Sequence, residues 1–190
     1  LLRHLDDDIS RRFNQIARDR FDVRIATGTK LEKTDNGVRL ELDNGESVEA
    51  EAILVATGRT PNGDQMDVDK AGIGLLADGR VSTDEFGRTT AEGVWALGDV
   101  SSPYMLKHVA NAEARTVQHN LLHSEDLRPL PHDNVPAAIF THPQIATVGL
   151  TEKQAREKGF DVTVKVQKFG DVAYGWAMED STGICKLVAD

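Results

Sequence analysis

Two short, continuous apolar runs constrain the fold of this chain more than any other feature of its sequence. Residues 52–56 and 93–97 carry no charged side chain, and each run is followed within two residues by a glycine. Such a run is typical of a strand that is buried on both faces, as in a parallel sheet covered by helices. The runs therefore predict an α/β fold, in which ligands collect at the carboxyl ends of the strands.

The remaining elements are predicted from periodicity and turn residues. Apolar residues recur at helical spacing in some segments, whereas others alternate and are separated by Asp-Asn-Gly turns. We expect helices over 6–18, 105–122 and 151–158, and strands over 22–26, 29–33, 38–42, 47–50, 137–140, 162–167 and 183–188. Residues 58–87 are expected to be mostly loop, and three prolines within 129–136 indicate a linker.

The composition excludes several classes of function. The 190 residues include 22 basic and 31 acidic side chains, for a formal charge of −9 and a pI near 5.1. Such a charge does not attract nucleic acid or anionic membranes, and no apolar run approaches the roughly 20 residues that span a bilayer. Cys185 is the single cysteine, which excludes an internal disulfide and favours a cytoplasmic protein. The histidines lack metal-ligand spacing, so no metal is expected.

A glycine and a carboxylate follow the second apolar run. Asp99 comes directly after Gly98, and the next helix is expected to begin six residues later. A carboxylate at a strand end can accept hydrogen bonds from the hydroxyl groups of a ribityl or ribose chain. The free N–H groups at the helix start would face the same ligand. After the first run, Gly58 allows close approach of the backbone to a ligand, although a plain strand-to-loop turn explains it equally well.

Together these motifs resemble a known family. Ala-Thr-Gly-Arg-x-Pro-Asn at 56–62, Gly-Asp-Val at 98–100 and Met-Leu-Lys-His-Val-Ala at 105–110 resemble the FAD-dependent, class I pyridine nucleotide–disulfide oxidoreductases. Residues 140–152 are similar to the opening of that family's dimerisation domain. Two further segments, 101–111 and 169–180, resemble an NADPH-dependent branch of the family that reduces a small-molecule disulfide.

The resemblance implies an α/β fold with two dinucleotide-binding domains, which becomes α+β at the C-terminal end. Residues 1–51 would be the C-terminal part of the NAD(P)H-binding domain and 52–127 the second half of the FAD-binding domain. Residues 128–190 would begin a dimerisation domain, truncated here, of a homodimeric parent protein. The chain begins with Leu1 and stops inside an alternating stretch, so we expect a piece of a longer protein.

The resemblance also assigns contacts to FAD. Asp99 would bind the ribityl chain, and the start of the following helix would lie against the isoalloxazine ring. Residues at the end of the first run would lie where FAD and NADPH meet. The helix-start residues assigned to FAD are Met105, Leu106, Lys107 and His108, and the residues assigned to the junction are Ala56, Thr57, Gly58 and Arg59.

Arg3 and Leu31 are assigned to NADPH. Residues 1–6 resemble the segment in which NADPH-using relatives place an arginine on the 2′-phosphate. A guanidinium binds a phosphate through paired, charge-assisted hydrogen bonds worth on the order of 1.5–3 kcal/mol. This corresponds to about a ten- to hundredfold preference for NADPH over NADH; the alternative for Arg3 is a solvated surface arginine. Leu31 matches a backbone contact near the adenine.

The catalytic residues of the family are not expected in this chain. The family chemistry passes a hydride from NADPH to FAD, and then electrons to a Cys-x4-Cys disulfide, helped by a histidine–glutamate pair of the other subunit. Residues 1–190 contain one cysteine, so activity is expected of the parent protein and not of this segment alone. Two alternatives remain, an NAD-dependent enzyme like dihydrolipoamide dehydrogenase and a non-catalytic nucleotide-binding or dimerisation fragment.

Some residues receive a purely structural interpretation. Gly72 and Gly74 match a dinucleotide fingerprint, but no buried strand precedes them and a turn follows, so we predict no such site. Cys185 is expected to be an inert core residue. Tyr174 and Trp176 are expected to serve packing.

Overall fold

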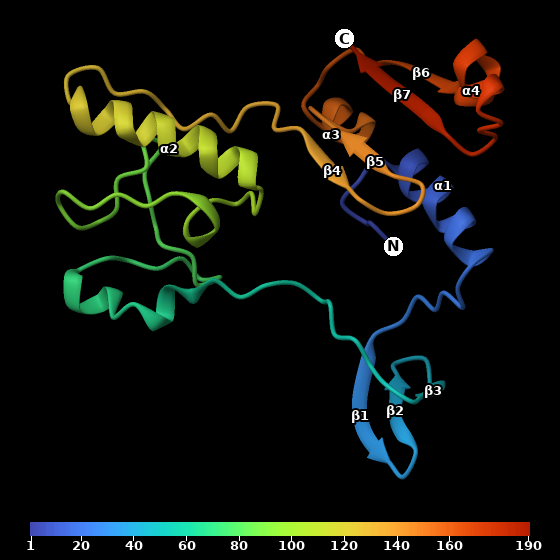
Figure 1. Cartoon of the computed structure of the whole chain (residues 1–190). Helices are drawn as coiled ribbons and strands as arrows, with labels where there is room; N and C mark the ends of the chain where they lie inside the picture. The colour runs from blue at the N-terminus through green and yellow to red at the C-terminus, as the bar shows by residue number, and fades with distance from the viewer. The chain divides into compact units, whose positions relative to one another are not determined.

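The computed structural model describes all 190 residues and divides into two compact units. The first unit contains Leu1–Ala56, Phe140–Ile145 and Leu150–Asp190, and the second contains Thr57–Ile139 and Ala146–Gly149. Figure 1 labels the helices and strands along the chain. None of the helices is long and apolar enough to cross a membrane.

Helix α1, Asp7–Arg18, confirms the helix expected near the N-terminus. Its N-cap is Asp6, whose carboxylate accepts a hydrogen bond of 3.0 Å from the Asp8 N–H. The acidic first turn lies at the positive end of the helix dipole, where negative charge is stabilising. The helix buries Ala17.

A three-stranded antiparallel meander follows α1, with the strand order β1-β2-β3 (Figure 1). Its strands are β1 (Gly28–Thr34), β2 (Gly37–Leu42) and β3 (Ser47–Ala50). Gly37 opens β2 with a φ of 153°, and a Cβ there would collide with the carbonyl oxygen of Ala50. The Asp-Asn-Gly turns therefore produce the predicted hairpins because glycine alone fits the tight backbone.

The later elements are short, apart from helix α2 (Lys107–Leu122), which buries one side chain per turn. Helix α3 (Glu152–Glu157) lies within the helix predicted over 151–158, and the structure shows that it begins with a capping box of Thr151 and Gln154. The other regular elements are α4 (Ala173–Ala177), the strand pair β4 (Ala137–Ile139) and β5 (Ile145–Thr147), and the antiparallel pair β6 (Thr163–Lys168) and β7 (Ile184–Ala189). Four 3-10 turns complete the fold: η1 (Asn62–Gln65), η2 (Val68–Ala71), η3 (Gly98–Val100) and η4 (Phe169–Asp171).

Three expected strands are not formed. Residues 22–26 and 52–56 form no regular secondary structure, and Leu54 is 89% exposed. Within 93–97, a single isolated bridge joins Trp95 to Arg88. The apolar pattern identifies residues suited to the interior of a sheet, but a strand also needs a neighbouring strand for its hydrogen bonds. No other segment of this chain pairs with 22–26 or 52–56.

Three packing predictions are wrong as well. Cys185 is exposed, and Tyr174 and Trp176 are 78% and 76% exposed. Cys185 lies on the outward side of β7, because the alternation of the strand turns Lys186 inward. Helix α4 has five residues and is too short to bury side chains all around its circumference.

The turn that the sequence predicts after Gly72 and Gly74 is confirmed, since the Gly79 N–H donates a hydrogen bond of 2.9 Å to the Leu76 carbonyl. Gly72 ends the turn η2 with a φ of 71°, and Leu75 forms an isolated bridge with Val81. No helix follows the two glycines.

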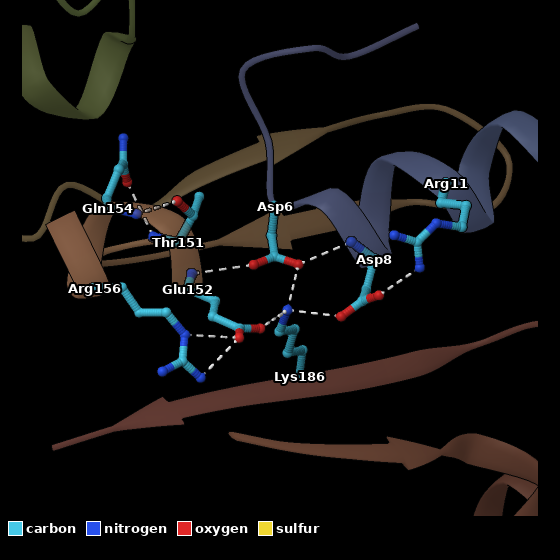
Figure 2. A network of polar contacts seen from close by, with 8 residues as sticks. All are labelled: Asp6, Asp8, Arg11, Thr151, Glu152, Gln154, Arg156 and Lys186. Atoms are coloured by element: carbon cyan, nitrogen blue, oxygen red, sulfur yellow. Dashed lines mark hydrogen bonds and ion pairs between the residues drawn. The ribbon is translucent and has the colours of Figure 1, made fainter. Parts of the chain in front are cut away.

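The ammonium group of Lys186, whose side chain is 5% exposed, joins three elements of the first unit (Figure 2). Its Nζ atom lies 2.8 Å from Asp6 Oδ1, 2.7 Å from Asp8 Oδ2 and 2.8 Å from Glu152 Oε2. These carboxylates belong to the N-terminal ends of α1 and α3, whereas the lysine belongs to β7. One cation thus joins three elements that are distant in the sequence.

The network shifts the pKa values of its members in opposite directions. Burial alone would raise the pKa of Asp6, but the hydrogen bond from Lys186 and the backbone N–H groups of Glu152 and Asp8 outweigh it and lower that pKa. Hydrogen bonds from Lys186 also lower the pKa values of Asp8 and Glu152. Burial alone would lower the pKa of Lys186, but its three carboxylate partners raise it above its usual range.

These shifts predict how the free energy of unfolding depends on pH. Since the carboxylate pKa values are lowered in the folded state, their contribution is present above about pH 4 and is lost as the pH falls through the folded values. Since the pKa of Lys186 is raised, its contribution is present below about pH 10 and is lost only at more alkaline pH. We expect Lys186→Met to lower the free energy of unfolding by about 3 kcal/mol at pH 7, and by less at pH 3.

Urea denaturation of wild type and Lys186→Met at pH 3 and pH 7, followed by circular dichroism, measures this difference. Lys165→Met is the matched control, because Lys165 is exposed on the paired strand β6 and opposite Leu187. An equal loss of stability at both pH values would contradict the expectation.

Candidate cofactor site

The predicted Gly-Asp motif lies on the turn η3, which packs against helix α2. Gly98 has a φ of 69°, and a Cβ there would lie 3.4 Å from the Cβ atom of Ala110. The N–H of Gly98 donates a hydrogen bond of 2.6 Å to Oε2 of Glu113. Asp99 is therefore attached to a turn that is fixed on the N-terminal half of α2.

Glu113 is the central buried group of this region, with 0% exposure. Its second oxygen, Oε1, lies 2.6 Å from Nε2 of His132, on the segment that follows α2. The ring of His132 contacts Tyr104 edge-on, with the centroids 5.2 Å apart. The Tyr104 hydroxyl donates to the His132 carbonyl at 3.3 Å. The carboxylate thus connects η3, α2 and the predicted linker.

The N-terminus of α2 has no side-chain cap. Leu106 is its N-cap and has an extended backbone, so the N–H groups of the first turn are free of side-chain partners. Met105 precedes the helix, which corrects the predicted start by two residues, and is 51% exposed. Lys107 is also exposed, while Nε2 of His108 lies 2.8 Å from the carbonyl oxygen of Pro136. This end of the helix can receive a polar or anionic group.

Asp99 also lies near a residue of the first predicted motif. Its Oδ2 is 3.7 Å from Nη1 of Arg59, and the two side chains are 55% and 72% exposed. An exposed pair at this distance contributes little to stability, so both groups remain available to a ligand. Gly58 has a φ of 133°, a backbone angle that favours glycine. This angle explains why a glycine follows the first apolar run.

The other predicted residues belong to different parts of the chain. Arg3 is exposed on a turn closed by a hydrogen bond of 3.1 Å from the Leu5 N–H to the Leu2 carbonyl. Leu31 lies in β1, an edge strand of the meander, and is 49% exposed. Arg3, Leu31 and Ala56 belong to the first unit, whereas Thr57, the other junction residues and the predicted FAD contacts belong to the second.

Sequence interpretation misses the two buried charges, Glu113 and Lys186. Glu113 lies four residues from Val109 and from Val117, which is the spacing of the buried face of α2. Lys186 occupies an inward position of an alternating strand. A charged residue at an apolar position of a regular pattern is the signal for a buried and paired charge, and here it would have found both residues.

Comparison with known proteins identifies the family. The sequence signature described as "Pyridine nucleotide-disulphide oxidoreductase" matches residues 1–114, and that of the family's dimerisation domain matches residues 135–190. This chain belongs to the pyridine nucleotide-disulphide oxidoreductases, and its fold is the mixed α/β type of the flavoprotein disulfide reductases.

Within this family, the chain is similar to several individual proteins. The chain is 54% identical over 195 residues to mycothione reductase of Mycobacterium tuberculosis (strain ATCC 25618 / H37Rv), covering 100% of this chain and 42% of the relative. It is 37% identical to dihydrolipoyl dehydrogenase of Mycobacterium leprae, covering 88% of this chain and 37% of the relative. Among solved structures, the HOCl-induced flavoprotein disulfide reductase RclA from Escherichia coli superposes with a TM-score of 0.89 at 30% identity, covering 100% of this chain and 44% of the other. The chain thus spans less than half the length of these relatives.

Glu113 provides a test of how the Gly-Asp turn is held. Glu113→Ala would leave the Gly98 N–H and the His132 ring without their carboxylate partner, and we expect the free energy of unfolding to fall by about 3 kcal/mol. Urea denaturation measures the change. Glu125→Ala removes an exposed carboxylate and serves as the control, with an expected change within about 0.5 kcal/mol. Similar losses in the two variants would contradict a special role of Glu113.

Proposed function

We propose that this chain is part of an FAD- and NADPH-dependent disulfide reductase that reduces mycothione to mycothiol. The 54% identity with mycothione reductase along 100% of this chain carries the proposal. The identity with dihydrolipoyl dehydrogenase is 37% over 88% of the chain. Residues 101–111 and 169–180 agree with this choice, since they resemble mycothione reductases within the family.

The proposal includes the division of the chain into parts of three domains. Residues 1–51 would belong to the NADPH-binding domain, 52–127 to the FAD-binding domain and 128–190 to the domain that forms a homodimer. The match of 135–190 to the family's dimerisation domain supports the last assignment. Because residues 1–190 contain one cysteine, the redox-active pair would come from polypeptide outside them. A cytoplasmic location is part of the proposal, because a small thiol is kept reduced there.

The residues around η3 fit a flavin nucleotide. The exposed Asp99 carboxylate can accept hydrogen bonds from ribityl hydroxyl groups, and the uncapped start of α2 presents free N–H groups to a polar ring edge. When bound, FAD supplies a carrier that takes a hydride from the nicotinamide and passes two electrons to a disulfide. Lys107 and His108, in the first turn of α2, would border the ring together with Met105 and Leu106.

The nicotinamide cofactor would be held by Arg3, by Leu31 and by the residues at the end of the first apolar run. Arg3 is exposed and forms no ion pair within the chain, so its guanidinium is available to the 2′-phosphate of NADPH. Leu31 lies on an open sheet edge, where its backbone can contact the adenine side of the cofactor. Ala56, Thr57, Gly58 and Arg59 would lie where FAD and NADPH meet, as the family resemblance implies.

The 37% identity with dihydrolipoyl dehydrogenase supports a second candidate function, that of a related flavoenzyme that uses NAD. The two functions differ in the nicotinamide cofactor, and Arg3 is the residue on which that difference depends. The oxidation rates of NADPH and NADH by the full-length protein therefore separate them.

We expect Arg3→Leu in the full-length protein to lower the preference for NADPH over NADH by about ten- to hundredfold, because the paired hydrogen bonds to the phosphate are lost. The measurement is kcat/KM with each cofactor. Arg18→Leu is the control, since Arg18 is an exposed arginine in the last turn of α1. If Arg3→Leu leaves the ratio unchanged, Arg3 does not bind the phosphate.

We expect Asp99→Ala in the full-length protein to raise the dissociation constant of FAD by about ten- to hundredfold, because charge-assisted hydrogen bonds to the ribityl chain are lost. Titration of FAD into the flavin-free protein, followed by flavin fluorescence, measures the affinity. Asp133→Ala removes another exposed carboxylate of the same unit and should leave the affinity unchanged. Equal affinity of wild type and Asp99→Ala would refute the assignment.

A further inference from the structure

The turn that carries Arg3 is held at both of its ends. On one side, the Leu1 carbonyl accepts hydrogen bonds from Ser10 Oγ at 2.9 Å and from Asn14 Nδ2 at 3.1 Å. On the other side, three residues after Arg3, Asp6 enters the network of Lys186. The position of Arg3 therefore depends on the position of helix α1.

Asp6 connects α1 to the region of the dimerisation domain. One of its oxygens, Oδ1, accepts the Asp8 N–H at 3.0 Å, and the other, Oδ2, accepts the Glu152 N–H at 3.2 Å (Figure 2). A single carboxylate thus contacts the N-terminal ends of both α1 and α3. It can keep this position because Lys186 neutralises it from β7.

The network is balanced in charge. Asp8 also pairs with Arg11 at 2.8 Å, and Glu152 pairs with Arg156 at 3.0 Å, so three carboxylates face three cations. The two arginines are 66% and 54% exposed, whereas Lys186 is 5% exposed. Lys186 is also the only one of the three cations that contacts more than one carboxylate. Its removal would leave neighbouring negative charges that repel one another.

A second contact joins α1 to the same region. The guanidinium of Arg12 donates to the carbonyl oxygens of Thr182 and Ser181, each at 3.0 Å. These residues lie just before β7, separated from it by Gly183. Helix α1 is therefore held at its N-terminus and on its side by residues 152–186, which lie within the match to the dimerisation domain.

We propose that Lys186 is a positioning residue for NADPH selectivity: it holds the start of α1, and with it the Arg3 turn, in the place where the guanidinium meets the 2′-phosphate. This inference rests on the proposed function of Arg3. Lys186 contacts no cofactor in this role. It acts through Asp6 and Asp8, and it makes the affinity for a phosphorylated cofactor depend on residues of the dimerisation domain.

The test compares phosphorylated and unphosphorylated ligands on the full-length holoenzyme. For Lys186→Met, we expect KM for NADPH to rise about five- to tenfold, with KM for NADH and both kcat values within about twofold of wild type. By calorimetry, the dissociation constant of adenosine 2′,5′-bisphosphate should rise by about the same factor, while that of 5′-AMP stays unchanged. Lys186→Arg keeps the cation and should retain most of the selectivity.

Two further variants serve as controls for misfolding and for the unspecific effect of removing a charge. Asp8→Asn removes one contact at a residue whose side chain is 34% exposed, and it should shift selectivity in the same direction but less. Lys165→Met, an exposed lysine on the paired strand, should leave all values unchanged. A merely structural role of Lys186 would raise KM for both cofactors together or lower Tm alone, and either result would overturn the inference.

Arg3→Leu separates failure of this inference from failure of the proposed function. If Arg3→Leu loses the NADPH preference and Lys186→Met does not, the positioning role is wrong and the proposed function stands. If Arg3→Leu also leaves the preference unchanged, the proposed role of Arg3 is wrong and the inference falls with it. In the double variant we expect no loss beyond that of Arg3→Leu, because both changes act on the same contact.

Discussion

An ammonium group that is withdrawn from water needs acceptors on every side, and in this chain that need joins three distant segments. Lys186 on β7 contacts Asp6, Asp8 and Glu152 at 2.7–2.8 Å. Desolvating a charge costs several kcal/mol unless paired groups compensate for it. The two short helices and the strand therefore keep one arrangement as long as the pairing is complete, and the turn that carries Arg3 shares that arrangement.

The second unit uses a buried charge of the opposite sign in a similar way. The Glu113 carboxylate contacts the Gly98 N–H and the His132 ring, each at 2.6 Å. The buried apolar residues of the chain are mostly alanine and valine, so few large apolar side chains lie in the interior. They are Ala17, Leu42, Val68, Val81, Val109, Val117 and Ala155. Glu113 contacts Gly98, the neighbour of Asp99 in the chain, and Lys186 contacts Asp6, three residues after Arg3.

Local patterns predict helices α1, α2 and α3 and the meander well, but not the five-residue helix α4. The acidic start of α1 at Asp6, the start of α3 at Thr151 and the glycine turn at Gly37 each depend on a few neighbouring residues, and each belongs to a helix or hairpin that the pattern predicts. The same reasoning fails for residues 52–56 and for Cys185. A strand needs hydrogen bonds from a second segment, and the buried side of a strand depends on what packs against it. Neither is encoded in the pattern of the strand itself.

For the candidate site, local motifs pointed to Gly58 and Asp99, because a glycine with special backbone angles and a carboxylate beside a helix start are local requirements. The resemblance to the family that these motifs carry added Arg3 to the expected contacts. Folding added Glu113 and Lys186, whose importance comes from partners 15 to 180 residues away. A charge requires fixed partners only when other segments remove water from around it, because an unpaired buried charge is costly. The removal of water depends on three-dimensional packing and not on neighbours in the chain.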